Sequence, residues 1–421
     1  MKTARPGDLV LIKTASETLE GTFLTRSELL DKNILVLKLP TGYNIGIHRK
    51  NIKKITTLRP AHTPLAPAPK AQHNPNLPTI AILSTGGTIS SKIDYRTGGV
   101  HADYTADDFC AMLPELSLIA NITTKKVLNI MSEDATPADW LAIAENTIDA
   151  LRKADGVVIT HGTDTMHYTA AALSFLLKDL GKPVILTGAQ RSIDRGSSDA
   201  FMNLLCAVTA AAQWNSREVA ICMHASMNDD YCHLIRGTKA RKMHTSRRDA
   251  FRAVNDTPLA RVYPDGRIEE LAPAQPRRDT TPELRPIDKH VSLIYAHPNL
   301  HPQEIELCLK QKTKAILIAA TGLGNLPIHT KEKILPALLK AAKKVPIFIC
   351  AQTPFGRVHP NVYSTMRELS ILCGAHYLED MHAETALAKL CVAVTHKDPL
   401  TFMRENIAGE YTDRSLDDHF L

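Results

Sequence analysis

The sequence predicts an α/β protein with a two-lobed, mainly parallel sheet, preceded by a small all-β barrel-like domain. Continuous apolar runs that end in glycine, such as 80–87 and 156–162, are typical of buried parallel strands. Helical patterns alternate with these runs, which favours right-handed β-α-β crossovers. A proline-rich stretch separates them from several short strand-like runs near the start of the chain.

Residues 1–58 are expected to form the small β domain. Short strand-like runs such as Gly7-Asp-Leu-Val-Leu-Ile12 alternate with polar turns, and roughly five strands in this length suggest an SH3-like or similar barrel. The end of this domain, 48–54, is basic. Two interpretations of the basic segment stay open: a docking surface for RNA or a partner, and a solvated edge strand protected by lysines.

Prolines divide the rest of the chain. Six prolines between residues 59 and 78 predict a semi-extended linker, and four more between 272 and 290 predict a second one. A large α/β domain is therefore expected at 79–271. A smaller C-terminal α/β domain with a polar tail is expected at 291–421.

Alternating patterns place the elements of both lobes. In the large lobe we expect helices at 137–153, 166–180 and 199–213, and strands at 79–84, 127–131, 156–160, 183–187 and 218–223. In the smaller lobe we expect helices between strands at 291–296, 315–320 and 345–350. Ligands of open α/β sheets collect at the carboxyl ends of such strands.

Composition argues against several classes of protein. Of 421 residues, 44% are hydrophobic and 22% charged, as in an ordinary globular protein, and no apolar run reaches the length of a membrane span. The first residues have no signal-peptide core. The eight cysteines form no Cys-x-x-Cys pair, so reduced thiols in a cytoplasmic protein are expected. The 18 histidines form no His-Glu-x-x-His motif, so no metal site is predicted.

Two strand ends carry threonines beside glycines. One apolar run ends in Thr85-Gly-Gly-Thr88, and the strand 156–160 continues into His161-Gly-Thr-Asp164. The glycines let backbone N–H groups approach a developing oxyanion. A threonine hydroxyl is a poor nucleophile at its free pKa and needs a base nearby, for which Asp164 and a lysine are candidates. Taken alone, each motif also fits a plain strand-to-loop turn.

Taken together, Thr85-Gly-Gly-Thr-Ile89 and His161-Gly-Thr-Asp-Thr-Met166 resemble the two signature motifs of the bacterial-type L-asparaginases. The resemblance runs from about Ile80 to Val394, three quarters of the chain. The segments 241–251 and 38–46 are also similar to one branch, the D subunit of the archaeal glutamyl-tRNA(Gln) amidotransferases. The resemblance implies an asparaginase-like fold and an amide hydrolase that supplies ammonia to a partner subunit.

The resemblance also implies catalytic roles for individual residues. Thr88 would be the nucleophile, with Thr163 as the alternative. Asp164 and Lys242 would take part in proton transfer, and Tyr95 matches a tyrosine on a lid that covers the nucleophile. Without the resemblance, Tyr95 fits a loop aromatic that rests on the surface.

Further positions match the substrate-binding residues of that family. Ser132 matches a serine that binds the amino-acid head group, whereas Glu133 departs from the usual glutamine, which leaves the choice between asparagine and glutamine open. Capping of the following helix is the alternative role for the acidic residues here. Gly87 and Gly162 would line the same pocket. Asn325 matches an asparagine that reaches the neighbouring subunit's site, and otherwise fits a plain Gly-x-Gly-Asn turn.

Charge along the chain gives weaker signals. The net charge of +6 permits contact with RNA without arguing for it. The segment 236–252 carries seven basic residues against one acid, and apart from Lys242 we expect it to form a solvated face.

As for partners, the resemblance implies no cofactor on this chain, with ATP and Mg on a subunit that amidates Glu-tRNA(Gln). It also implies a homodimer core within a heterotetramer, no contact with a membrane, and glutamine or asparagine as the amide donor. A free-standing cytoplasmic L-asparaginase is the alternative enzyme. A non-catalytic protein that binds RNA through the basic β domain is the alternative from another class.

Overall fold

The computed structural model of the chain describes residues 4–5, 7–24, 33–40, 44–59, 73–87, 91–93, 100–102, 113–191 and 197–415. The chain divides into two compact units. The first comprises residues 1–72 and 91–104, and the second comprises residues 73–90 and 105–421.

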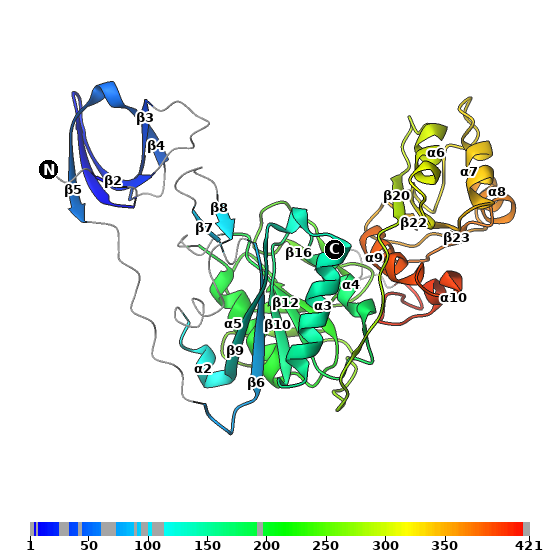
Figure 1. Cartoon of the computed structure of the whole chain (residues 1–421), viewed down its shortest axis with the longest axis horizontal. Coiled ribbons are helices and arrows are strands. Elements are labelled where there is room, and N and C mark those ends of the chain that lie inside the picture. The colour runs from blue at the N-terminus through cyan, green and yellow to red at the C-terminus, as the bar shows by residue number, and fades with distance from the viewer. Residues whose placement is uncertain are drawn as a thin grey trace. The chain divides into compact units, whose positions relative to one another are not determined.

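The first unit contains a five-stranded antiparallel sheet in the order β4-β3-β2-β1-β5 (Figure 1). Its elements are β1 (Leu9–Thr14), β2 (Thr18–Leu24), β3 (Ile34–Lys38), β4 (Asn44–His48), the 3-10 turn η1 (Arg49–Asn51) and β5 (Ile52–Arg59). Every second residue of a strand faces inward, which forms a small core of Val10, Ile12, Leu35, Leu37 and Ile47. The all-β prediction for this region is confirmed. A hairpin of β7 (Ser91–Ile93) and β8 (Val100–Ala102) is grouped with the same unit.

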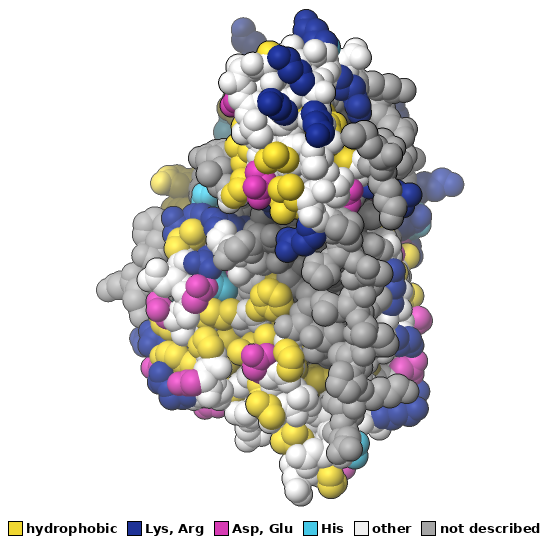
Figure 2. Space-filling view, turned by 90° about the vertical axis from the view of Figure 1, so that its left-hand side faces the viewer, with side chains coloured by type: hydrophobic (Ala, Val, Ile, Leu, Met, Phe, Trp, Pro, Cys, Tyr) yellow, Lys and Arg dark blue, Asp and Glu magenta, His cyan; other side chains and the backbone are white. Residues whose placement is uncertain are grey.

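The basic segment 48–54 lies at the end of β4, in η1 and on β5, which is an edge strand of this sheet. Its lysine and arginine side chains are exposed: Arg49, Lys50, Lys53 and Lys54. The upper part of Figure 2 shows Lys and Arg side chains gathered on one face of this unit. Lysines on an edge strand hinder its pairing with another chain, so the protective interpretation and the docking interpretation both remain.

The large lobe of the second unit is built on an eight-stranded sheet in the order β18-β17-β14-β13-β12-β10-β6-β9. The five strands from β13 to β9 are parallel, as predicted, and the other three extend the sheet as antiparallel strands. The bounds are β6 (Thr79–Gly86), β9 (Asn121–Ile130), β10 (Gly156–Thr160), β12 (Val184–Thr187), β13 (Val219–His224), β14 (Cys232–Arg236), β17 (Ala260–Val262) and β18 (Ile268–Glu270).

Helices lie on both sides of this sheet: Figure 1 shows α5 on one side and α3 and α4 on the other. The helical elements are α2 (Leu116–Ile119), η3 (Ser132–Asp134), α3 (Pro137–Leu151), α4 (Met166–Leu176) and α5 (Ala200–Gln213). Two short pairs complete the lobe: β11 (Leu177–Lys178) with β19 (Glu283–Leu284), and β15 (Ala240–Lys242) with β16 (Phe251–Ala253).

Three predictions for the large lobe were wrong in detail. The strand expected at 127–131 is the longer β9, whose polar residues are tolerated because β9 is an edge strand with exposed positions. The helix expected at 166–180 ends at Leu176, where the chain turns into β11. The antiparallel strands between residues 232 and 270 were not predicted, because they are short and lack continuous apolar runs.

The smaller lobe has a four-stranded parallel sheet: β20 (Val291–Tyr295), β21 (Ala315–Ala320), β22 (Ile347–Ala351) and β23 (His376–Tyr377). One face packs against α6 (Pro302–Lys310), α7 (Ile334–Ala342) and α8 (Ser364–Leu372). The other face packs against α9 (Ala383–Ala393), which is followed by α10 (Pro399–Arg404). Helix α9 also packs on α4, so one continuous apolar core joins the two lobes.

The segment 272–290, expected to be a linker, is packed along the large lobe. The Arg277 guanidinium donates to backbone carbonyls that include those of Trp214 and Asp155, and the Arg285 backbone N–H donates to Leu176. These contacts fix the path of the chain between the lobes.

Two further observations concern the described part of the chain. None of its helices combines the length and apolar character needed to cross a membrane. Its cysteines are buried and free: Cys206, Cys222, Cys232, Cys308, Cys350, Cys373 and Cys391.

Candidate active site

The carboxyl ends of three neighbouring strands meet at one edge of the large sheet. Strand β10 lies between β6 and β12 and is parallel to both, with Thr160 opposite Ser84 on one side and Thr187 on the other. The chain leaves β6 and β10 through the two glycine-containing motifs of the sequence. Such an edge is where open α/β sheets bind their ligands.

Glycines bring these turns into backbone contact. Gly86 and Gly87 have positive φ angles of 108° and 79°. A Cβ added at Gly87 would lie 2.3 Å from the N and Cα atoms of Gly162. A Cβ added at Gly162 would lie 2.7 Å from the Cβ of Ser132. Since only glycine permits these approaches, the two motifs and Ser132 form one closely packed wall.

Lys242 joins the second motif to a strand from a distant part of the chain. Its Nζ donates a hydrogen bond of 2.9 Å to Oγ1 of Thr163 and lies 2.6 Å from Oδ1 of Asp164. Thr163 is buried, and the Lys242 side chain is 10% exposed, whereas the Asp164 side chain is 64% exposed. The structure therefore brings these three predicted residues together at a site that is open to solvent on the side of Asp164.

This arrangement is suited to activating a hydroxyl group. A threonine becomes an effective nucleophile, or polarises a water, when a proton acceptor lies in hydrogen-bond contact with it. An amine is such an acceptor once it has lost its own proton, and in its charged form it stabilises a neighbouring oxyanion. The Asp164 carboxylate holds the Lys242 Nζ against Thr163. The three side chains can thus move a proton and stabilise negative charge.

Two polar side chains of the motifs have structural roles instead. The Thr85 hydroxyl is buried and donates to the carbonyl of Thr160 at 3.0 Å, which ties β6 to β10. His161 donates from Nδ1 to the Gly162 carbonyl at 2.7 Å, so Nε2 accepts from the Thr169 hydroxyl at 3.0 Å. Burial lowers the pKa of His161, so the ring is neutral and holds the turn in place.

Ser132 contacts the second motif directly. Its buried Oγ accepts a hydrogen bond of 3.2 Å from the backbone N–H of Asp164, and its carbonyl accepts one of 2.6 Å from the Thr165 hydroxyl. Glu133, the next residue, is exposed on η3. Helix α3 is capped by Thr136, whose N–H and hydroxyl donate to Asp139. The capping role considered for the acidic residues 133–134 was therefore wrong.

The basic segment 236–252 is not the solvated face that its composition predicts. Most of its cations form ion pairs, and Lys239 is 1% exposed. The pairs are Arg236–Glu218, Lys239–Asp380, Arg241–Glu384, Lys242–Asp164, Arg248–Asp229 and Arg252–Asp249. The acidic partners come from distant parts of the chain, so local composition gave no sign of them.

Other predicted site residues are not joined to this cluster by the described contacts. Asn325 is half-buried in a turn after β21, where its backbone N–H and carbonyl both bond to Thr321. Its predicted role in a neighbouring subunit's site stays a prediction. Thr88 and Tyr95 lie outside the described residues.

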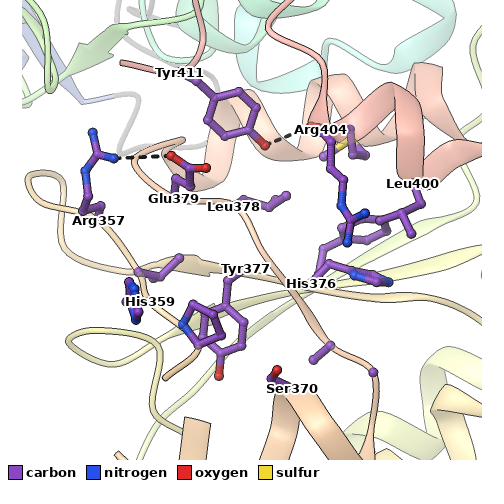
Figure 3. A pocket seen from close by; sticks show the side chains of 16 residues that line it. Arg357, His359, Ser370, His376, Tyr377, Leu378, Glu379, Leu400, Arg404 and Tyr411 are labelled. Carbon is purple, nitrogen blue, oxygen red and sulfur yellow. Dashed lines mark hydrogen bonds and ion pairs between the residues drawn. The ribbon is translucent and has the colours of Figure 1, made fainter. Parts of the chain in front are cut away.

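A cavity of about 700 Å³ lies elsewhere, in the smaller lobe (Figure 3). His376, Tyr377 and Arg404 are among its lining residues, and an ion pair between Arg357 and Glu379 lies at its wall. None of the cluster around Lys242 lines it. This cavity is therefore separate from the predicted active site.

The fold and the site define an amidohydrolase of the asparaginase class. The family model described as "Asparaginase, N-terminal" matches residues 79–274, and the "Glutaminase/Asparaginase C-terminal domain" matches residues 290–406. Two solved structures are similar. The thermostable L-asparaginase from Thermococcus kodakarensis has a TM-score of 0.71 and 29% identity, and covers 80% of this chain and 100% of its own. L-asparaginase I from Vibrio cholerae has a TM-score of 0.68 and 31% identity, and covers 80% of this chain and 99% of its own.

The N-terminal unit and the full-length relatives narrow this class. The "GatD N-terminal domain" model matches residues 4–58. The D subunit of the glutamyl-tRNA(Gln) amidotransferase of Thermococcus kodakarensis is 44% identical, over 99% of this chain and 96% of its own length. That of Methanothermobacter thermautotrophicus is 43% identical, over 97% and 94%. The chain belongs to the GatD family, the D subunits of glutamyl-tRNA(Gln) amidotransferases.

These similarities confirm the predicted fold and the predicted kind of enzyme, an amide hydrolase of the GatD branch. The free-standing asparaginase is not favoured, because the N-terminal model and the near full-length matches both belong to GatD. Among the residues that the structure describes, no group of three or more His, Cys, Asp or Glu side chains could hold a metal ion.

Proposed function

We propose that this chain hydrolyses the side-chain amide of glutamine or asparagine and passes the ammonia to a partner subunit that amidates Glu-tRNA(Gln). The observation that supports this most strongly is the contact of Lys242 with Thr163 and Asp164 at the glycine-lined sheet edge. It stands in a chain that resembles GatD along nearly its whole length.

The reaction proceeds through a threonine ester. A threonine hydroxyl attacks the carboxamide carbon and gives up its proton, and backbone N–H groups at the glycine turns hold the oxyanion, each worth about 3–4 kcal/mol in comparable sites. The carbon–nitrogen bond then breaks, and the nitrogen takes up a proton and leaves as ammonia. Water hydrolyses the ester, which restores the hydroxyl and releases the acid.

The residues divide into two reacting groups. Thr88 is the nucleophile favoured by the family resemblance, covered by Tyr95. Thr163, Asp164 and Lys242 form the proton-transfer group, and the described contacts among them also support Thr163 as the alternative nucleophile.

The amino-acid head group binds beside these residues. Ser132 supports the wall through its bond to Asp164, and the backbones of Gly87 and Gly162 complete it. Glu133 is exposed next to Ser132 and can pair with the substrate ammonium. Asn325 is assigned to the site of a neighbouring copy in a homodimer core.

The partner subunit carries the ATP- and Mg-dependent step, and the two kinds of subunit form a heterotetramer in the cytoplasm. Free, buried cysteines suit that reducing compartment. The N-terminal unit, with exposed cations on β5 and η1, is the part of the chain most suited to contact the partner or its tRNA.

The test compares ammonia release from glutamine by the chain alone, with its partner subunit, and with the partner and Glu-tRNA(Gln). We expect turnover to rise when the partner and charged tRNA are present. Strong turnover that neither addition changes would support a free-standing hydrolase. Binding to tRNA with no amide hydrolysis in any mixture would support a non-catalytic role.

A further inference from the structure

Strand β15, which carries Lys242, is held from the smaller lobe. Neighbouring residues of a strand point to opposite faces, so Arg241 leaves the strand on the side opposite Lys242. Lys242 reaches Thr163 and Asp164 in the large lobe, whereas Arg241 reaches Glu384 in α9 of the smaller lobe. The strand therefore lies between the reacting groups and a carboxylate of the other lobe.

The contact between Arg241 and Glu384 is well fixed. Nε and Nη2 of Arg241 each lie 2.9 Å from Oε1 of Glu384. Oε2 of Glu384 lies 3.0 Å from Nδ1 of the buried His382. The side chains of Glu384 and His382 are 6% and 2% exposed, so water competes little for these bonds.

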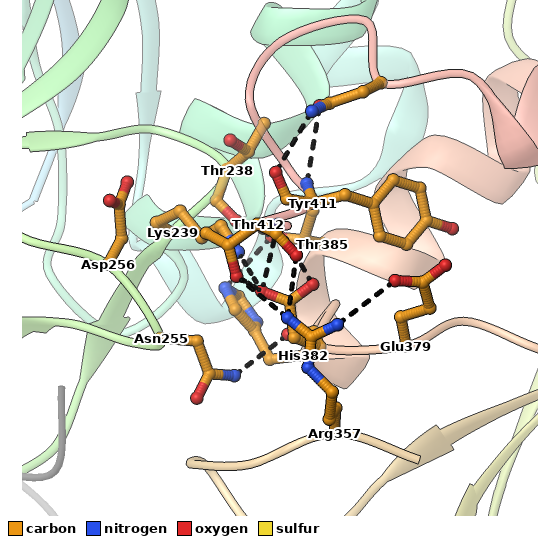
Figure 4. A network of polar contacts seen from close by, with 12 residues as sticks. Thr238, Lys239, Asn255, Asp256, Arg357, Glu379, His382, Thr385, Tyr411 and Thr412 are labelled. Carbon is orange, nitrogen blue, oxygen red and sulfur yellow. Dashed lines mark hydrogen bonds and ion pairs between the residues drawn. The ribbon is translucent and has the colours of Figure 1, made fainter. Parts of the chain in front are cut away.

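A second carboxylate holds the turn that leads into β15. Nζ of Lys239 lies 2.6 Å from Oδ2 of Asp380, and the two side chains are 1% and 0% exposed. Asp380 also accepts a hydrogen bond of 2.5 Å from the Thr412 hydroxyl. The Thr385 hydroxyl, from α9, donates to the carbonyl of Thr238 at 2.8 Å. Figure 4 shows how these side chains converge on the turn from α9 and from the chain after α10.

We propose that Glu384 and Asp380 are positioning residues, which set the place of the Lys242 amine by holding Arg241 and Lys239. We call these two acidic residues the carboxylate clamp. The clamp makes the smaller lobe part of the catalytic apparatus, although its carboxylates do not touch the reacting atoms. This inference rests on the proposed role of Lys242 in amide hydrolysis.

The expected effect falls on the chemical step. A displacement of about 1 Å in a reacting group can lower a rate by about a hundredfold. Ser132 and Gly162, which form the wall for the substrate, lie on other elements and do not depend on β15. Loosening the clamp should therefore lower kcat while KM changes little.

The experiment uses the full chain in complex with its partner subunit and measures kcat and KM for glutamine hydrolysis. Arg241→Met removes the cation at a partly exposed position, and Glu384→Gln removes the carboxylate. We expect both to lower kcat by about ten- to a hundredfold with KM within about twofold. Arg241→Lys, which keeps a cation for Glu384, should recover most of the lost kcat. The double variant should lose little more than either single variant.

Arg277→Gln is the matched control. Arg277 donates to the carbonyls of Trp214 and Asp155, and Asp155 immediately precedes β10, so this contact lies at the opposite end of that strand from Thr163. A lowered melting temperature in this variant with unchanged kcat shows that loss of stability alone does not slow the reaction.

The outcomes separate the clamp from the function on which it rests. Normal kcat in Arg241→Met and Glu384→Gln, with kcat lost in Lys242→Met, would overturn the clamp and keep the function. Equal loss of kcat in Arg277→Gln and the clamp variants would also overturn the clamp. Full activity of Lys242→Met would overturn the proposed function itself.

Discussion

Lys242 Nζ lies 2.9 Å from Oγ1 of Thr163 and donates a hydrogen bond to it, although 79 residues separate the two in sequence. This contact unites the strand end of β10 with the short strand β15. It places an amine beside a hydroxyl that a second hydrogen bond, from Lys242 to Asp164, helps to align. The hydrolase proposal depends on this contact.

Removal of the amine should stop the chemistry without unfolding the protein. Lys242→Met keeps the apolar stem and loses the charge, and we expect kcat for amide hydrolysis to fall by about 10²- to 10⁴-fold, the usual contribution of a general acid–base group. Lys178→Met is the control, since that lysine pairs on the surface with Glu283. A Lys242→Met enzyme with kcat near the wild-type value would contradict the assignment.

A side chain at Gly87 should separate the two motifs. Gly87→Ala places a Cβ 2.3 Å from the backbone of Gly162, and the backbone cannot yield as a flexible side chain would. We expect loss of activity and a destabilisation of about 2 kcal/mol or more. Gly266→Ala is the matched control, because Gly266 also has a positive φ, of 92°, but has open space around it. That variant should lose about 1 kcal/mol and keep its activity. Similar behaviour of the two variants would argue against close packing of the motifs.

The pH dependence of stability should report on Glu384. Burial alone would raise the pKa of Glu384, but the hydrogen bond from His382 and the charges of His382 and Arg241 outweigh it and lower the pKa to about 2. Because this pKa is below that of the unfolded chain, the stabilisation is complete above about pH 4.5 and is lost as the pH falls towards 2.

The measurement is the free energy of unfolding of wild type and Glu384→Gln between pH 7 and pH 3. The gap between the two proteins should be largest at neutral pH and should narrow in acid, with about 3 kcal/mol at stake over the full range. A gap that stays constant from pH 7 to pH 3 would contradict the ion pair between Glu384 and Arg241.

Ser132 should affect substrate binding more than the chemical step. Its Oγ supports the Asp164 backbone and lies against Gly162, on the wall assigned to the amino-acid head group. We expect Ser132→Ala to raise KM by about tenfold, which corresponds to the loss of one or two hydrogen bonds. Glu133→Gln should change the ratio of kcat/KM for glutamine and asparagine. Unchanged KM in Ser132→Ala would place the head group elsewhere.

The parts of the fold that depend on local patterns could be predicted from the sequence. Strands β6 and β10 are continuous apolar runs closed by glycine, so their type and the edge that they share followed from composition and order. Strand β9 was placed too late because its polar positions face outward at the sheet edge. Lys242 was assigned from the family resemblance, since nothing in the local sequence sets it apart from the neighbouring cations.

The contacts around Lys242 could not be predicted in this way. Arg241 and Glu384 are 143 residues apart, and Lys239 and Asp380 are 141 residues apart. A run of cations is usually solvated, and the partners that bury this one come from another lobe. Only the packing of α9 against α4 brings the acidic residues to β15.

The central claim is tested most directly by the ammonia source of the whole complex. Formation of Gln-tRNA(Gln) from Glu-tRNA(Gln) is measured with the chain carrying Lys242→Met, first with glutamine and then with ammonium chloride. We expect no product with glutamine and normal product with ammonium chloride, because the partner's amidation site is intact. Product formed with glutamine at the wild-type rate would contradict the account.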